Sequence, residues 1–365
     1  MINQLEVRAW DTLNRLMIIS EFISCIWTTQ YYDKGEFELV ISYSAELFDA
    51  LRLGNYIIRS DYTELAPFGV IETVSYKNDP NEGQILTVTG KLGISLLDRR
   101  LIYAWSNYRP QILTYCTDGQ NIEAAAFDAV LTHAINPASR RIAHLDTDVP
   151  LKGLPATGSK HVSTYQNLYN AITALLGGVY YGHRIRYDFV NRALIYDVYS
   201  GVDRSGRLKF SQDRENLISF SYTEDESQYK NNAYIGGEGE GLNRFVTATQ
   251  INGGFSTPTE RREMFYGASS DKEDNISNAD YAAILVTETK KENADYARVI
   301  SAGGEIDLTT SGLKYGEDFN VGDIITIEDI VTVKPRITTV VECQNENRYT
   351  VTAEFNEDVE YDVEE

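Results

Sequence analysis

One segment of the sequence has the composition of a phosphate-binding loop. Glycines surround Glu238 and Glu240 in the run Gly236–Gly241. Glycine-rich loops bind phosphate through backbone N–H groups, and nucleotide-binding loops add a lysine followed by serine or threonine. This run lacks that pair, and its carboxylates would repel a phosphate group. We therefore predict a flexible β-turn linker at this position and no cofactor-binding residue.

Cysteine and histidine, which often act as nucleophiles, bases and metal ligands, are few and widely spaced. The cysteines are Cys25, Cys116 and Cys343. Three distant cysteines form neither a CxxC pair nor an even-numbered disulfide framework, so we expect buried free thiols. The histidines are His133, His144, His161 and His183. They show no HExxH or other zinc-ligand spacing, and we predict no metal site.

Acidic residues are too numerous for their presence alone to indicate a hydrolase. A glycosidase needs two carboxyl groups across a cleft, and with 54 Asp and Glu residues some pair is always available. Asp197 and Glu215 lie in no recognisable catalytic context. No serine occupies a G-x-S-x-G motif, and no cysteine has a nearby histidine. We therefore predict no catalytic residue and expect that the chain is not an enzyme.

The charge of the chain limits its partners. Its 33 Lys and Arg residues face 54 Asp and Glu residues, a formal net charge of −21. Nucleic-acid binding depends on basic residues, so this composition argues against a protein that grips phosphates. Two interpretations of the charge stay open. It can serve solubility alone, or it can line a surface that nucleic acid must pass without sticking.

The same charge argues against adhesion to an anionic membrane. No stretch approaches the roughly 20 apolar residues that cross a bilayer. The N-terminal segment Met1–Arg8 lacks the basic and apolar regions of a secretory signal. We therefore expect no membrane anchoring, and we expect the protein to be made and folded in a cytoplasm.

The chain is predicted to be β-rich α+β, because it contains 25 tyrosines, 26 glycines and many β-branched residues. The predicted strands are 37–41, 56–59, 69–74, 85–89, 179–187, 193–199, 218–222, 233–235, 245–250, 323–327, 337–341 and 349–355. The predicted helices are 45–53, 92–98, 121–133, 165–175 and 279–300, the last with Lys290 and Lys291 on a solvated face. Ser44 is a suitable N-cap for the first helix. The two middle helices and a hairpin around Asn191 indicate a distinct α+β part.

Two segments of the sequence share a register. Gly54–Asp61 and Gly322–Asp329 each begin with glycine and end with aspartate, 268 positions apart. At the same offset Pro67 matches Pro335. Both segments continue into an I-x-x-V strand, at Ile71–Val74 and Ile337–Val340, and then into a V-T strand end, at 88–89 and 351–352. Chance reuse of β-strand patterns is one explanation. We favour a duplication that produced two related β domains.

A basic step interrupts the acidic chain at Leu97–Arg100. Arg99 and Arg100 can complement the dipole at the end of a short helix. They can equally form salt bridges with the acidic surface of a neighbouring subunit. Both interpretations stay open.

Several segments together resemble a siphovirus tail protein family whose members are similar to the baseplate or tail-tip hub. That hub also forms the N-terminal half of tail-associated lysins. The segments that carry the resemblance are Gly35–Leu39, Gly69–Glu72, Gly90, Leu96–Arg100, Asn216–Tyr222, Tyr229–Gly237 and Tyr315–Asp323. They occur in the expected order over most of the chain.

The resemblance implies two tail-tube-like β-barrel domains with an inserted α+β domain. With this sequence, the expected boundaries are 1–105 for the first barrel, 106–215 for the α+β middle domain and 216–355 for the second barrel with its long helix. Residues 356–365 are expected to form an acidic tail.

The resemblance also implies a homotrimer whose six barrels form a pseudo-sixfold ring at the virion tail tip, assembled in the host cytoplasm. The implied partners are the distal tail ring, the tail tube, the tape measure and tip or fibre proteins. DNA is expected to pass through the ring without being bound.

Two features depart from the family pattern. Lys91 stands where arginine is expected, and the chain ends at Glu365 without the hydrolase or fibre module that lysin-type relatives append. A structural hub is therefore the favoured interpretation. The alternatives are a tail-associated peptidoglycan or saccharide hydrolase, and a carbohydrate-binding adhesin that uses some of the 25 tyrosines as stacking platforms.

Overall fold

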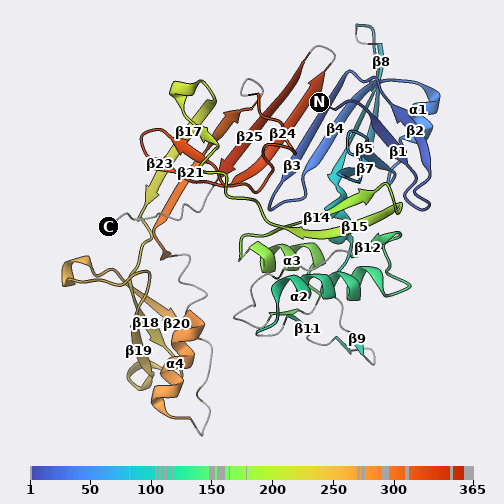
Figure 1. Ribbon diagram of the computed structural model, residues 1–365. Helices are drawn as coiled ribbons and strands as arrows, with labels where there is room; N and C mark the ends of the chain where they lie inside the picture. Colours follow the sequence, from blue (N-terminus) through green and yellow to red (C-terminus); the bar gives the residue numbers. More distant parts are fainter. Residues whose placement is uncertain are drawn as a thin grey trace. The chain divides into compact units, whose positions relative to one another are not determined.

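The fold was analysed in a computed structural model (Figure 1). The structure describes residues 2–81, 83–102, 105–106, 109–110, 113–116, 119–147, 153, 161–163, 165–177, 179–268, 272, 276–289, 296–308, 312–345 and 348–356. The chain divides into two compact units. The first unit comprises Met1–Phe220 and Gly303–Asn356, and the second comprises Ser221–Ala302. Each unit is described by itself below.

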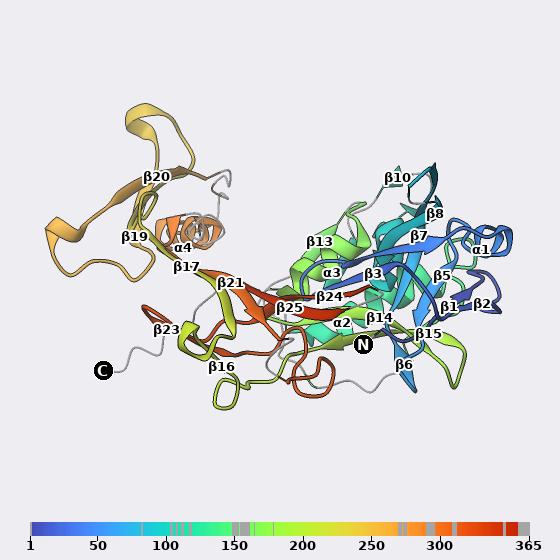
Figure 2. The same ribbon diagram turned by 90° about the horizontal axis from the view of Figure 1, so that it is seen from above.

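A mixed set of sequence-distant strands forms one eleven-stranded sheet. In spatial order the strands are β17 (Leu217–Asp225), β21 (Val299–Asp307), β25 (Tyr349–Asn356), β24 (Ile337–Asn345), β3 (Ser24–Gln30), β4 (Glu36–Ser42), β8 (Gly83–Leu92), β7 (Phe68–Asp79), β5 (Tyr56–Arg59), β1 (Leu5–Arg8) and β2 (Arg15–Ile19). Strands from the two ends of the chain therefore meet in the middle of the sheet, where β24 and β3 lie side by side in both views (Figures 1 and 2).

An α+β part packs against this sheet within the first unit. Its strands and helices are α2 (Ile122–Val130), η2 (Leu131–Ile135), β12 (Leu145–Asp146), α3 (Leu168–Gly177), β14 (Gly182–Asp188) and β15 (Ala193–Tyr199). The hairpin β14–β15 also pairs with β6 (Leu65–Ala66) and β12. The helices cover one face of this small sheet (Figure 1), and Phe127 of α2 meets the ring of Tyr196 at 5.3 Å between centroids. Phe68 and Val70 belong to the same apolar core.

The remaining elements of the first unit are short. They are α1 (Ala45–Ala50), η1 (Gly93–Arg99), β9 (Trp105–Ser106), β10 (Arg109–Pro110), β11 (Leu113–Cys116), β13 (His161–Ser163), β16 (Lys209–Phe210), η3 (Gln212–Arg214), β22 (Thr326–Glu328) and β23 (Thr332–Val333). Ser44 caps α1 as predicted, because its hydroxyl accepts a hydrogen bond from Leu47 N–H at 3.1 Å.

The second unit is a small three-stranded sheet with one helix. Its elements are β18 (Asn232–Gly236), η4 (Gly241–Asn243), β19 (Val246–Gln250), η5 (Pro258–Glu260), β20 (Glu263–Gly267) and α4 (Asn278–Thr289). The strand β18 lies between β19 and β20 and is parallel to β20. Tyr281 and Leu285 of α4 pack on Ala233 and Ile235 of β18, which forms a separate apolar core.

Most predicted elements are present, but several of their ends differ. The helix expected over 279–300 ends at Thr289, and Val299 already begins β21. The β-branched pair Val299–Ile300 favours a strand once it has a neighbour in the sheet. The helix expected over 45–53 ends at Ala50, and the one expected over 92–98 is a 3-10 helix. Lys290, Lys291 and the acidic segment 357–365 lie outside the described residues.

The β-rich prediction is confirmed, but the described strands do not form a closed barrel. The strand order ends at β17 on one side and at β2 on the other. No helix in the described part of the chain is long and apolar enough to cross a membrane.

The packing around Gly90 in β8 generates a prediction. A Cβ at this residue would lie 1.8 Å from the backbone oxygen of Val70 and 3.0 Å from the Phe37 ring. The variant Gly90→Ala should therefore lower the free energy of unfolding by about 3 kcal/mol, since backbone cannot yield as a side chain does. Urea denaturation measures this loss. Gly206→Ala is the control, because its Cβ would meet nothing within 4 Å. Equal effects of the two substitutions would contradict the packing described here.

Candidate functional site

Two segments of the sheet have the same hydrogen-bond pattern. In the first, Gly54 N–H donates to Ile71 C=O at 2.8 Å, and Ile71 N–H donates to Asn55 C=O at 2.9 Å. In the second, Gly322 N–H donates to Ile337 C=O at 2.7 Å, and Ile337 N–H donates to Asp323 C=O at 2.9 Å. Each glycine has a positive φ, 88° and 95° respectively, which explains why glycine begins both strands. The match found in the sequence at Gly54 and Gly322 is therefore also a structural match.

The following hairpins share an irregularity in the same place. In the pair β7–β8 the register shifts between Ile71 and Thr73, where Ile71 faces Gly90. In the pair β24–β25 it shifts between Ile337 and Thr339. A β-bulge is a specific feature of a fold, so the I-x-T-V sequences of the two strands occupy equivalent positions. Ile71 thus corresponds to Ile337, an offset of 266 in place of 268.

Two of the predicted correspondences are wrong as a result. The carbonyl of Pro335 accepts a hydrogen bond from Ile325, whose counterpart in the first segment is Ile57. Ile57 faces Gly69, and the carbonyl of Pro67 accepts its hydrogen bond from Arg59, two residues after Ile57. Pro335 therefore corresponds to Gly69 and not to Pro67. Likewise Val88 corresponds to Ala353 and not to Val351. The loop between the two strands differs in length by two residues, which loops tolerate easily.

The equivalence extends to the neighbouring strands. In the first repeat, β4 pairs with β8, with Phe37 opposite Gly90. In the second, β21 pairs with β25, with Gly304 opposite Phe355. We call β3, β4, β8 and β7 with Tyr56–Arg59 the first repeat. The second repeat is β17, β21, β25 and β24 with the segment 322–328. Within each repeat the order along the sheet is the same.

The repeats are joined edge to edge by the antiparallel pair β24–β3. The register runs from Thr339 opposite Gln30 to Asn345 opposite Ser24 without a break. We call this pair the internal junction. In the order across the sheet, β24 is the last strand of the second repeat and β3 is the first strand of the first repeat, so the two repeats are hydrogen-bonded to each other here.

A buried ion pair lies beside the internal junction. Arg59 of β5 donates to Glu342 of β24 at 2.6 Å, and the two side chains are only 2% and 3% exposed. Arg59 also binds Asp61, and Tyr349 donates its hydroxyl proton to Glu342 at 2.6 Å. Burial acts to lower the pKa of Arg59, but Asp61 and Glu342 outweigh it and hold that pKa well above its usual value. The guanidinium therefore stays charged and holds together strands that are distant in sequence.

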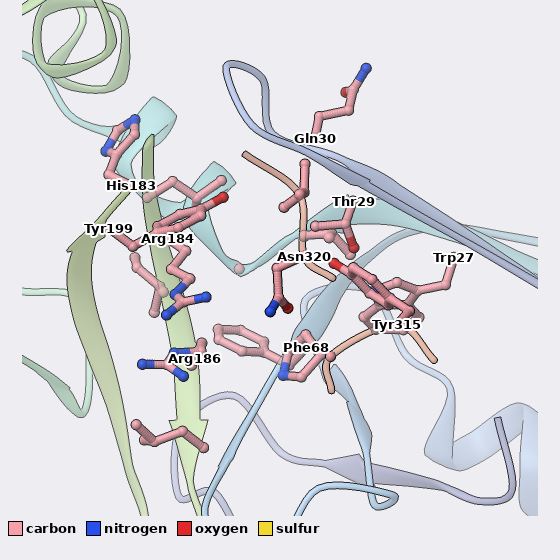
Figure 3. Close-up of a pocket in the computed structure, with 18 of the residues that line it drawn as sticks. Trp27, Thr29, Gln30, Phe68, His183, Arg184, Arg186, Tyr199, Tyr315 and Asn320 are labelled. Atoms are coloured by element: carbon pink, nitrogen blue, oxygen red, sulfur yellow. The ribbon is translucent and has the colours of Figure 1, made fainter. Parts of the chain in front are cut away.

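A cavity of about 380 Å³ lies next to this ion pair (Figure 3). Arg184 and Arg186 extend from β14 toward it, and Trp27 and Tyr315 lie on its other side. Both arginines bind Asp197, at 3.1 Å and 3.0 Å. Burial, followed by the charge of Arg184, lowers the pKa of Arg186 to about 10.

The buried carboxylates that border the cavity all have arginine partners. They are Glu342, paired with Arg59, and Asp323, which binds Arg204 at 2.6 Å. A general acid needs a raised pKa, and a nucleophilic carboxylate needs an approach for substrate. Carboxylates held by guanidinium groups meet neither need. The arrangement is suited to holding strands together, within the large sheet at Arg59–Glu342 and within the hairpin β14–β15 at Asp197.

Two histidines are buried in the α+β part. His183 stacks on the ring of Tyr169 at 5.3 Å, and its Nε2 lies 2.9 Å from the hydroxyl of Thr173. Burial lowers the pKa of His183 to about 3. It also lowers the pKa of His133 to about 4, with help from the charge of Arg140. Both rings are therefore neutral parts of the core at physiological pH.

Of the other residues singled out in the sequence, Cys25 and Cys343 lie on the paired strands β3 and β24, where Cys25 faces Gln344 and Cys343 faces Ile26. Cys25 and Cys116 are buried thiols as predicted, whereas the thiol of Cys343 is half-buried. Glu215 is the C-cap residue of the 3-10 helix η3 and has a positive φ of 53°. Among the described residues no cluster of three or more His, Cys, Asp or Glu side chains could hold a metal.

The glycine-rich run is not arranged as a phosphate cradle. Arg244 donates to the carbonyls of Gly236 and Gly237, both at 3.1 Å. The N–H of Glu238 donates to the hydroxyl of Tyr281 at 2.7 Å. These groups are already used to close the turn between β18 and β19.

The basic step at Leu97–Arg100 has partners within the chain. Asp98 binds Lys34 at 2.8 Å, and Arg99 lies in the last turn of η1. Arg100 donates to the carbonyl of Arg140 at 2.6 Å. These contacts support the role in ending a helix, and the role at a subunit contact stays a prediction.

Solved structures with the same fold include tail proteins and a chain of a Francisella complex. The tail protein from Neisseria meningitidis MC58 matches with a TM-score of 0.54 at 14% identity, covering 97% of each chain. The 43 kDa tail protein of prophage MuSo2 from Shewanella oneidensis matches with a TM-score of 0.53 at 10% identity, covering 96% of this chain and 98% of that one. A chain of the Francisella PdpA–VgrG complex matches with a TM-score of 0.51 at 10% identity, covering 97% of this chain and 52% of that one.

The fold is thus that of phage tail proteins. The chain belongs to the Siphovirus ReqiPepy6 Gp37-like protein family, whose model matches residues 6–355. It is therefore a structural protein of the siphovirus tail and a component of the virion, as the resemblance in the sequence indicated. No curated protein matches the chain.

The buried ion pair generates a prediction about stability. Glu342→Ala leaves the buried guanidinium of Arg59 with Asp61 alone, and should lower the free energy of unfolding by about 3 to 5 kcal/mol. The double variant Arg59→Met with Glu342→Met should regain most of this loss, because neither of the two most deeply buried charges remains. Urea denaturation compares them. Glu36→Ala, which removes the exposed pair with Lys91, is the control and should have little effect. A double variant no better than Glu342→Ala would contradict this account.

The buried histidines generate a prediction about pH. Both folded pKa values lie below the unfolded value near 6.5, so the unfolded chain binds more protons as the pH falls through 6.5. Stability should therefore be lost between pH 6.5 and 5, by up to about 1.4 kcal/mol per pH unit for each histidine. His183→Gln should reduce this slope, and adding His133→Gln should remove most of the rest. Denaturation at several pH values measures it, and an unchanged slope in the double variant would refute the assignment.

Proposed function

We propose that this tail protein is the hub of the tail tip, a homotrimeric ring that connects the tail tube to the tip and leaves a channel for DNA. The observation that carries the proposal is the pair of matching repeats joined edge to edge at the internal junction. One chain supplies two similar sheet segments side by side. Three chains then supply six, which is the number that a sixfold tube requires of a trimeric adaptor.

The two repeats are expected to be the inner faces of the two tube-like barrel domains, 1–105 and 216–355, with 106–215 as the inserted α+β domain. A barrel that is open within one chain can be completed by its neighbours, because a ring of head-to-tail subunits pairs every sheet edge. The strand order of the described residues, which leaves both ends of the sheet open, is compatible with that expectation.

The charge supports passage of DNA without binding. Several of the basic side chains already have partners in the chain, as in the arginine pairs with Asp197, Asp323 and Glu342. Their positive charge is largely cancelled locally, and the net charge of −21 leaves the remaining surface strongly acidic. Phosphates would be repelled from a wall of this kind, so DNA could slide past it.

The expected partners are the distal tail ring, the tail tube, the tape measure and the tip or fibre proteins, at the tip of a virion assembled in the host cytoplasm. We expect no enzymatic activity, since the buried carboxylates that line the cavity are paired with arginines. No contact or cavity described above favours the hydrolase or the carbohydrate-binding adhesin over the hub.

The copy number tests the proposal. Electron cryomicroscopy of intact tails should locate three copies of the chain around one axis at the tip, enclosing a channel. For the isolated protein, sedimentation at increasing salt should shift the equilibrium toward trimer, because screening reduces repulsion between subunits of charge −21. Six copies, or a single copy per tip, would overturn the ring.

A further inference from the structure

We propose that the strand β17 of one copy pairs antiparallel with the exposed edge of β7 in the next copy, repeating the internal junction between chains. The register places Ser75 opposite Phe220 and Asn78 opposite Leu217. The inference rests on the proposed ring and deepens it, because it names the two sheet edges that meet and the residues that face each other.

The internal junction is the template for this contact. In β24–β3, Val341 faces Thr28 and Gln344 faces Cys25. The offset of 266 established by the bulge makes Val341 equivalent to Ser75 and Gln344 equivalent to Asn78. The position of β24 in the second repeat is thus occupied by β7 in the first.

The strand β17 is the counterpart of β3. Phe37 corresponds to Gly304, so Val40 corresponds to Asp307. Val40 faces Ser24, and Asp307 donates its N–H to the carbonyl of Asn216. Ser24 therefore corresponds to Asn216, which makes Thr28 equivalent to Phe220 and Cys25 equivalent to Leu217.

The exposure of equivalent residues differs as an open edge predicts. Glu342 is 2% exposed in β24, where β3 covers the strand, but its counterpart Tyr76 in β7 is 46% exposed. Val341 is half-buried, and its counterpart Ser75 is exposed. In β7 the pairing with β5 stops at Val70, so among the described strands only β8 pairs with the part of β7 beyond it.

The other edge shows the same contrast. The strand β17 ends the strand order of the sheet within the described residues, with β21 on one side. Ile218 is 51% exposed, whereas its counterpart Ile26 is half-buried between β24 and β4. An open edge with apolar residues is a hazard for a protein unless a partner pairs with it.

The charges of the two edges permit the contact. Leu217–Phe220 carries no charged side chain, and Ser75–Asn78 carries only Lys77. Most surfaces of a chain with net charge −21 would repel a second copy. The seam equivalent to the whole internal junction, Thr73–Asp79 with Asn216–Tyr222, contains one acidic residue, Asp79, and its charge is offset by the ion pair with Lys77 at 3.8 Å. A second copy of this chain is therefore the occupant that the edges fit.

Disulfide trapping with four single-cysteine substitutions tests the register. The variants are Ser75→Cys, Tyr76→Cys, Ser219→Cys and Phe220→Cys, each in a separate full-length chain. Two mixtures are in register, Ser75→Cys with Phe220→Cys and Tyr76→Cys with Ser219→Cys.

The other two combinations of the same variants are the controls. They are one residue out of register, and their side chains would point to opposite faces of the sheet. Successive antiparallel pairs alternate in geometry, so at least one in-register mixture has the close Cβ spacing that a disulfide needs.

After mild oxidation of protein assembled as trimer, at least one in-register mixture should give ten times more cross-linked dimer than either mismatched mixture. Each variant alone gives the background from Cys25, Cys116 and Cys343. A trimer in which no in-register mixture exceeds the mismatched ones would overturn this interface and leave the ring intact. A chain that stays monomeric at every salt and protein concentration, and is absent as a trimer from tails, would overturn the ring and the interface together.

Discussion

The structure depends on the requirement that sheet edges be paired. Backbone N–H and C=O groups along an edge strand are costly to bury and prone to unwanted pairing when exposed. The pair β24–β3 satisfies this requirement at the centre of the eleven-stranded sheet. It joins a strand near the N-terminus to one near the other end of the described chain. The two repeats, the buried ion pair and the cavity beside it all take their positions from this pairing.

The ion pair shows what the pairing imposes on the side chains. Glu342 lies on a strand that is covered by β3, so its carboxylate is removed from water and needs a partner. Arg59, at the end of β5, supplies it, and Asp61 and Tyr349 complete the hydrogen bonds. In the first repeat Tyr76 occupies the equivalent position and is half exposed. One position in the repeat thus carries an acid where the edge is covered and an amphipathic ring where it is open.

Much of the local structure could be predicted because it depends on neighbouring residues. The cap at Ser44, the strand Tyr56–Arg59 and the hairpin around Asn191 follow from side-chain type and alternation within a few positions. Helix and strand ends were less predictable, as at Thr289 and Val299, because a strand there depends on partners elsewhere in the sheet. The repeat was visible at Gly54 and Gly322, where both backbones need a positive φ. The proline match failed because the intervening loop changed length.

The sequence by itself determined the family, the β-rich composition, the acidic charge and the two glycine positions at which each repeat begins. It could not determine which strands lie next to each other, because pairing across the sheet depends on backbone groups that every residue shares. Arg59 and Glu342 are 283 positions apart, and no spacing signals that they meet; the arginine within the apolar run Tyr56–Arg59 was the only hint. The tertiary structure alone decided that the repeats lie edge to edge, which edge of each stays open, and which buried carboxylates are held by arginines.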